Sequence, residues 1–155
     1  MHGEWRRRQR REGSTAVKVS LGRRYQFAAS HRLHSPKLTA EANRRLYGKC
    51  NSPYGHGHNY VVEAVFSGHV ARETGMIANL GDLDPFVERE VIEVFDHKYL
   101  NEQVAAFRDV VPTTENLARE VFRRLKSFPG AKLERVRIEE TSKNSFEYSG
   151  EEAID

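Results

Sequence analysis

His56 and His58 stand two residues apart at the head of an alternating apolar run that continues from Asn59 to Gly68. Alternation with a period of two predicts a β-strand, in which positions i and i+2 lie on the same face. From the usual rise per residue, the two imidazoles are about 7 Å apart along the strand. Two histidines on one strand face can close on a single metal ion, so we expect a metal site where this strand begins.

A third nitrogen ligand is available upstream. His31 keeps the parity of the alternating residues before it, whereas His34 has the opposite parity and follows the expected strand end, so we expect His31 to reach the metal. Three histidine ligands leave one position of zinc open, which is typical of catalytic sites. A His-x-His pair alone is common in strands that bind nothing. The prediction depends on its neighbours, which are Gly55, Gly57 and the single cysteine, Cys50.

The length of 155 residues fits one domain that forms a core without disulfides. A single cysteine excludes an internal disulfide framework and favours a reducing, cytoplasmic compartment. The apolar runs are shorter than the roughly 18 residues that a membrane span requires. The basic N-terminus is not followed by an apolar stretch, so it does not resemble a secretory signal.

The net charge of +3 is accounted for by the first 12 residues, which hold five arginines and two glutamates. We therefore predict a basic, disordered tail over residues 1–15 and a single domain over 16–155. Because the charges of the domain balance, it lacks the basic surface typical of nucleic-acid recognition. We expect neither nucleic acid nor a membrane as partner.

Hydrophobic patterns predict strands at both ends of the domain and helices between them. The expected strands cover residues 16–29 (in which Gly22 permits a bulge or bend), 58–66, 76–80, 133–138 and 146–148. This order favours an α+β fold, in which helices cover one face of an antiparallel sheet of about four strands. A sheet of this size has unpaired edges, so we expect the chain to form oligomers.

Capping residues locate the expected helices. Asp82 is a suitable N-cap for the first long helix, and Thr113 or Thr114 for the second. A short helix over residues 39–47 would form an insertion between the first two strands. That insertion would carry Cys50 toward the histidines.

Further candidate groups lie outside the histidine stretch. Asp96 and His97 are adjacent at an expected helix end, where a solvated pair is the commoner outcome but a proton shuttle is also chemically suitable. Glu139 and Glu140 end a strand and point to opposite faces, so at most one of them faces the core. An inward acid needs a partner, such as a ring N–H of a ligand, although two solvated acids are as common.

Six short motifs together resemble the 6-pyruvoyltetrahydropterin synthase family. The motifs are Ser30-His31-Arg32-Leu33-His34-Ser35-Pro36, Gly48-Lys49-Cys50-Asn51 with Gly55-His56-Gly57-His58-Asn59-Tyr60, Asn79-Leu80, Asp96-His97-Lys98, Thr113-Thr114-Glu115-Asn116 and Glu140-Thr141. The resemblance extends from about Val17 to Glu151 and leaves out only the arginine-rich tail. Their order and spacing are far more specific than the His-x-His pair alone.

The resemblance implies a tunnelling fold (T-fold), with a four-stranded antiparallel sheet and two helices on one face. In this family three sheets close into a barrel, two trimers stack into a homohexamer, and the active sites lie between subunits. It also implies Zn²⁺ as cofactor, and 7,8-dihydroneopterin triphosphate as the substrate from which triphosphate is eliminated. The product would be 6-pyruvoyltetrahydropterin, which belongs to tetrahydrobiopterin biosynthesis.

Matching motif to motif, the resemblance implies a role for each candidate residue. His31, His56 and His58 would bind zinc. Cys50 would be the general base, with Asp96 and His97 of a neighbouring subunit as proton-relay partners. The implied pterin-binding residues are Glu140, Thr113, Thr114 and Glu115. No dinucleotide motif accompanies them, and an internal rearrangement needs none.

Two alternatives stay open at this point. The related 6-carboxytetrahydropterin synthase of queuosine biosynthesis acts on the same substrate, but its cysteine typically stands three residues before His-Gly-His. Five residues, 51–55, intervene here, which favours the pyruvoyl enzyme. The second alternative is a non-catalytic, zinc-containing pterin-binding oligomer, which would not require Cys50 or the Asp96-His97 pair.

Overall fold

The computed structural model describes residues 17–151. The predicted tail over residues 1–15 lies outside them, as do the first residue and the last four of the predicted domain. Among the described residues, no helix is long and apolar enough to cross a membrane.

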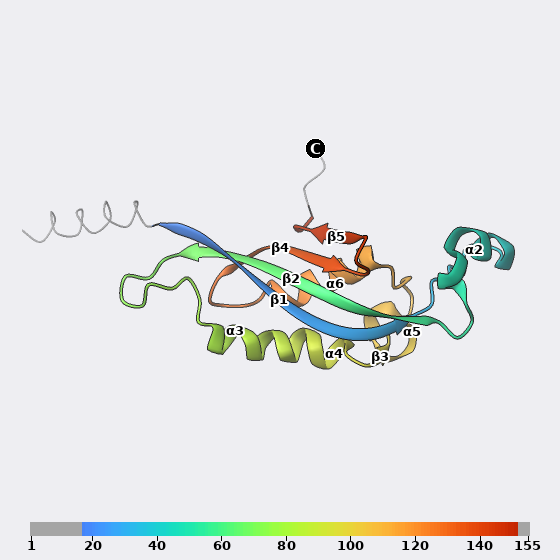
Figure 1. Ribbon diagram of the computed structural model, residues 1–155, viewed down its shortest axis with the longest axis horizontal. Coiled ribbons are helices and arrows are strands. Elements are labelled where there is room, and N and C mark those ends of the chain that lie inside the picture. The colour runs from blue at the N-terminus through green and yellow to red at the C-terminus, as the bar shows by residue number, and fades with distance from the viewer. Residues whose placement is uncertain (1–16, 152–155) are drawn as a thin grey trace, which may run out of the picture.

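A twisted sheet forms one layer of the molecule, and helices form the other (Figure 1). Its strands are β1 (Lys18–His31), β2 (His56–His69), β3 (Lys98–Tyr99), β4 (Lys132–Glu139) and β5 (Ser145–Tyr148). The spatial order is β3-β1-β2-β4-β5, and all pairs are antiparallel except that of β1 with β3. The predicted α+β class and antiparallel four-stranded sheet are confirmed. The structure adds the short parallel strand β3, which has only two residues and therefore shows no alternating pattern in the sequence.

The helical layer consists of two segments. The first begins with α3 (Leu80–Val87), continues through a π-helical turn over Glu88–Ile92 and ends with α4 (Glu93–Phe95). The second is α6 (Thr114–Leu125), and the Thr113 side chain caps it by accepting the N–H of Asn116, as predicted. The remaining helices are short: α2 (Ala40–Tyr47), which confirms the predicted insertion, and α5 (Leu100–Gln103).

Two local predictions are wrong, namely the strand over residues 76–80 and the helix N-cap at Asp82. Residues 76–80 do not form a strand; instead Asn79 caps α3 by accepting the N–H of Gly81, which moves the helix start ahead of Asp82. An Asn side chain that bonds the backbone two residues on competes with strand pairing. Gly22 forms no bulge, because β1 and β2 stay in continuous register past it. The irregularity lies between Val65 and Phe66, where β2 pairs with β4.

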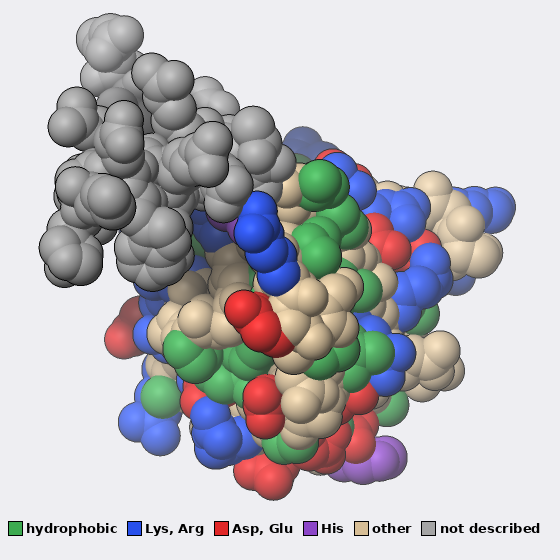
Figure 2. Space-filling model, turned by 90° about the vertical axis from the view of Figure 1, so that its left-hand side faces the viewer, with side chains coloured by type: hydrophobic (Ala, Val, Ile, Leu, Met, Phe, Trp, Pro, Cys, Tyr) green, Lys and Arg blue, Asp and Glu red, His purple; other side chains and the backbone are tan. Residues whose placement is uncertain are grey.

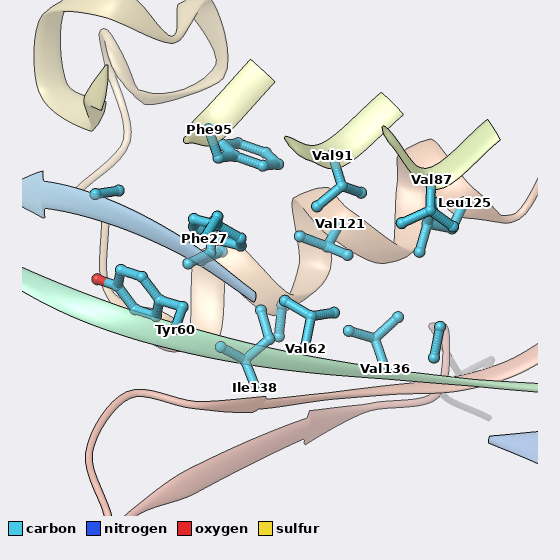
Figure 3. Close-up of a cluster of buried hydrophobic side chains, with 14 of the residues drawn as sticks. Phe27, Tyr60, Val62, Val87, Val91, Phe95, Val121, Leu125, Val136 and Ile138 are labelled. Carbon is cyan, nitrogen blue, oxygen red and sulfur yellow. The ribbon is translucent and has the colours of Figure 1, made fainter. Parts of the chain in front are cut away.

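The core lies between the sheet and the helices. Its largest contributors alternate along the strands and face apolar side chains of α3, α4, α6 and the π-helical turn (Figure 3). The labelled residues are Phe27, Tyr60, Val62, Val136 and Ile138 from the strands, and Val87, Val91, Phe95, Val121 and Leu125 from the helical layer. Because alternate side chains of a strand point to opposite faces, burying one face determines which strand residues point away from the core.

The two ends of the long β1–β2 ribbon differ. At the end viewed in Figure 2, basic, acidic and apolar side chains are interspersed over the described surface. At the other end, next to α2, the inward positions change from apolar residues to histidines, and the candidate site lies there.

Candidate metal and catalytic site

The register of β1 and β2 brings three histidines together. His31 is the last residue of β1 and pairs directly with His56, the first residue of β2, while His58 pairs with Ala29. The ring centroids lie 4.9 Å (His31–His56), 5.0 Å (His31–His58) and 4.6 Å (His56–His58) apart. All three have the parity of the buried Phe27 or Tyr60, so they extend the core face.

Gly55 permits the tight entry into β2. Its φ is +70°, and an added Cβ would lie 2.8 Å from the carbonyl oxygen of His31. A larger residue would therefore push the two strand ends apart and separate His31 from His56. Gly57 has no comparable role on this face, because its parity directs it to the other side of the sheet.

His31 is held in one orientation and one tautomer. Its side chain is fully buried, and Nδ1 lies 2.9 Å from the carbonyl oxygen of Pro112, which can only accept a hydrogen bond. The Nδ1–H therefore donates to Pro112, and the lone pair of Nε2 faces the other histidines. Burial lowers the pKa of His31 to about 4, so the ring is neutral at neutral pH. Metal-binding histidines show this arrangement of a fixed N–H and a free nitrogen.

A short 3-10 turn over Gly48–Asn51 presents Cys50 to the histidines. The carbonyl of Cys50 accepts the N–H of Leu33 at 2.7 Å, and the buried Asn51 side chain donates to the carbonyl of Leu33 at 2.7 Å. Arg32 donates from Nε to the Asn51 carbonyl. These bonds tie the turn to the segment after β1. Burial, reinforced by the charge of Glu140, raises the pKa of the Cys50 thiol.

Glu140 reaches the histidines from the end of β4. It shares the inward parity of Ile138, while Glu139 points to the other face and pairs with Arg137 at 3.1 Å. Its Oε1 lies 3.3 Å from Nε2 of His58 and 3.8 Å from Nε2 of His31. The prediction that only one of the two acids faces the core side agrees with this geometry.

The donor atoms fit a metal ion. Two groups have ligand atoms within 4.8 Å of one another, namely His31, Cys50 and His56, and His31, His58 and Glu140. His31 belongs to both groups, and the other two histidines enter different ones. Nε2 of His58 is buried and has no hydrogen-bond partner among residues 17–151. Burial also lowers the pKa of His58, which favours the neutral ring. A cation would satisfy this nitrogen.

The residues predicted to bind a ligand are divided between the site and its surroundings. Thr113 caps α6 one residue after Pro112, so the helix start lies next to His31. The hydroxyl of Thr114 is buried and has no partner in the described part of the chain. Glu115 is exposed in the first turn of α6.

Asp96 and His97 do not join the cluster within one chain. The side chain of His97 is 83% exposed, and it lines a hollow of about 480 Å³ together with Ser30, Asn59 and His58. Oδ1 of Asp96 accepts the N–H of Ala28 at 2.9 Å, and His97 donates its own N–H to the Ala28 carbonyl. The pair is therefore fastened to the edge of β1.

Several supporting residues carried no recognisable signal in the sequence. Pro112 acts through its backbone carbonyl, a group that every residue has. The hydroxyl of Tyr60 lies 3.3 Å from His31 Nδ1, but in the sequence Tyr60 resembles an ordinary aromatic residue of the core. Asn51 belongs to a motif noted above, but its anchoring role depends on a contact 18 residues away. His34 bonds Asn51 at 3.0 Å and belongs to neither group of donor atoms.

Comparison with known proteins places these observations in a family context. Residues 20–151 match the family described as 6-pyruvoyl tetrahydropterin synthase. The chain is 48% identical to the 6-pyruvoyl tetrahydrobiopterin synthase of Poecilia reticulata over 126 residues, covering 81% of this chain and 86% of that one. It is 43% identical to the Homo sapiens protein of the same name over 140 residues, covering 90% and 97%. The structure of Caenorhabditis elegans 6-pyruvoyl tetrahydropterin synthase superposes with a TM-score of 0.83 at 40% identity, covering 88% and 98%.

Proposed function

The chain belongs to the 6-pyruvoyl tetrahydropterin synthase family of enzymes and has its tunnelling fold, and from that premise we propose that it converts 7,8-dihydroneopterin triphosphate to 6-pyruvoyltetrahydropterin. The reaction releases triphosphate and rearranges the side-chain hydroxyls to two carbonyls, which requires no external oxidant. The observation that carries the proposal is the convergence of three histidines, a cysteine and a glutamate at one end of the β1–β2 ribbon.

We propose that His31, His56 and His58 hold a zinc ion. When bound, zinc acts as a Lewis acid that polarises the substrate's side-chain oxygens and makes the neighbouring protons more acidic. The neutral, buried His31 supports this role because its Nε2 lone pair is available at neutral pH. The unpartnered Nε2 of His58 supports it as well.

Cys50 is the proposed general base, accepting a substrate proton at Sγ. Without a cation, burial and the charge of Glu140 raise the pKa of the thiol, so it would be protonated at neutral pH. A cation on the adjacent histidines favours the thiolate, which makes the proposed base depend on the proposed metal site. The 3-10 turn, held by Asn51, fixes where Sγ meets the substrate.

The pterin ring is proposed to lie between Glu140 and the start of α6. A carboxylate accepts ring N–H groups, and the free backbone groups and unpartnered Thr114 hydroxyl at the helix start offer further hydrogen bonds. Thr113 and Glu115 complete the proposed pterin-binding set.

Asp96 and His97 are proposed to act on the site of a neighbouring subunit, within a homohexamer built from two trimers. The 83% exposure of the His97 side chain supports this arrangement, as does the absence of Asp96 from both groups of donor atoms that include the histidines of its own chain. A cytoplasmic location is proposed on the basis of the single free cysteine.

A product assay tests the proposal. Purified protein with zinc and 7,8-dihydroneopterin triphosphate should release triphosphate and a 6-pyruvoyl pterin, identified by mass spectrometry. A 6-carboxy product with loss of a two-carbon fragment would assign the chain to the queuosine branch instead. Zinc binding without any conversion would indicate the non-catalytic pterin-binding alternative.

A further inference from the structure

Glu140 and His58 are close but do not bond one another. Oε1 of Glu140 lies 3.3 Å from Nε2 of His58, yet the geometry is not that of a hydrogen bond, and this buried nitrogen has no partner in the described chain. A neutral imidazole nitrogen and a carboxylate oxygen at this distance, with no hydrogen bond between them, are both able to bind one cation. Two ligands of one metal ion stand in this relation.

The separations match those of neighbouring ligands around zinc. A tetrahedral ion with bonds of about 2.0–2.1 Å places its ligand atoms about 3.3 Å apart. The distance is 3.3 Å from Glu140 Oε1 to His58 Nε2, within the group formed by His31, His58 and Glu140. His56, whose Nε2 lies 3.2 Å from His31 Nε2, belongs to the other group of donor atoms. The distance from Glu140 Oε1 to His31 Nε2 is 3.8 Å, which is slightly longer.

The second oxygen of Glu140 is also engaged. Asn144 donates from Nδ2 to Oε2 at 3.2 Å, and the N–H of Glu140 bonds the carbonyl of Asn144. The short turn between β4 and β5 thus orients the carboxylate so that Oε1 faces the histidines. Hydrogen bonds of this kind commonly orient carboxylates that bind metals.

We propose that Glu140 is itself a ligand of the metal ion in the substrate-free enzyme, and that it leaves the ion when the pterin ring takes its carboxylate. The inference rests on the proposed zinc site and extends it. Under this proposal, the fourth position on the ion would become free only when substrate binds, because Oε1 of Glu140 cannot contact the ion and accept a ring N–H at the same time. The exchange would break no covalent bond of the chain: the carboxylate would give up its contact with the ion and accept hydrogen bonds from the ring N–H groups.

The test uses the full chain loaded with Co²⁺, whose visible absorption reports the number and kind of its ligands. We expect Glu140→Gln to change the spectrum of the substrate-free protein and to weaken Co²⁺ binding by at least about tenfold. Glu139→Gln is the matched control, because that side chain lies on the other face and pairs with Arg137. It should leave both the spectrum and the affinity unchanged.

A second measurement tests the exchange. Adding pterin without a side chain to the wild-type Co²⁺ protein should shift its spectrum toward that of Glu140→Gln, while the variant itself should respond far less. Identical spectra and affinities for wild type and Glu140→Gln would overturn the proposal. It would also be overturned if the substrate-free protein showed a sulfur-to-cobalt charge-transfer band that Cys50→Ser removes, because Cys50 would then be the ligand in place of Glu140. Failure of the wild-type protein to bind any Co²⁺ or Zn²⁺ would overturn the proposed metal site as well, so the two failures are distinguishable.

Discussion

Two histidine-containing regions of this chain differ in burial, in partners and in backbone conformation. His31, His56 and His58 converge on the core face, and His31 is fully buried with its tautomer set by Pro112. His97 is 83% exposed at the β1 edge and has a φ of 57°, the only positive φ of a non-glycine residue between 17 and 151. Continuous strand pairing positions the first region, whereas a helix end fastened to one residue, Ala28, positions the second.

The difference shows that one chain brings the candidate metal ligands together but does not surround them with every candidate catalytic group. Asp96 and His97 keep a defined place, yet they present the imidazole outward. An outward histidine whose backbone is hydrogen-bonded to a strand edge is compatible with the proposed sharing of the site between subunits. Substitutions in each region would show whether the two have separate roles.

The largest expected effect separates metal binding from chemistry. His56→Ala should lose stoichiometric zinc and turnover together, because it removes a nitrogen 3.2 Å from His31 Nε2. Cys50→Ala should keep the zinc and lose turnover by a factor of about 10² to 10⁴, the usual contribution of general acid–base catalysis. Metal analysis and the product assay measure both. Full activity of Cys50→Ala would remove the cysteine from the proposed mechanism.

The next prediction concerns the sharing of sites between subunits. Cys50→Ala and His97→Ala should each be inactive alone, while each retains zinc. In co-expressed mixed oligomers of equal composition, about a quarter of the sites should regain activity, because a site then combines Cys50 from one subunit with His97 from another. Activity that stays at the level of the separate variants would place both residues in the site of a single chain.

Acid should destabilise the metal-free protein through His31. Its folded pKa of about 4 is lower than the ordinary 6.5, so the unfolded chain binds this proton first. The stabilisation is present above pH 6.5 and is lost as the pH falls toward 4, with a total on the order of 3 kcal/mol. Urea unfolding at a series of pH values measures it. His97→Ala is the matched control, and the same slope in a His31→Gln variant would contradict this origin.

The smallest expected effect concerns the attachment of Asp96. Asp96→Ala removes the acceptor for the Ala28 N–H and should cost about 1 kcal/mol of stability, while Asp96→Asn keeps an oxygen there and should cost less. Neither change should alter zinc content, because the carboxylate lies outside both groups of donor atoms. Thermal unfolding and metal analysis check the two parts. Loss of zinc in either variant would show that the two regions are coupled.

The sequence by itself determined the strand faces and the helix caps that matter for the site. The alternation through β1 and β2 placed His31, His56 and His58 on one inward face, because a period of two follows from strand geometry alone. Thr113 was identifiable as a cap because its bond to Asn116 is local. The six motifs that resemble the family were likewise readable in order, and the family match confirms that identification.

Only the tertiary structure decided how segments far apart in sequence meet. The strand expected over residues 76–80 became a loop and helix start, because the Asn79 cap outcompetes a short apolar pattern. The carbonyl of Pro112, the anchoring by Asn51 and the approach of Glu140 to His58 all join residues 18 to 82 positions apart. Such contacts depend on packing and register across the whole sheet, which local propensity does not encode.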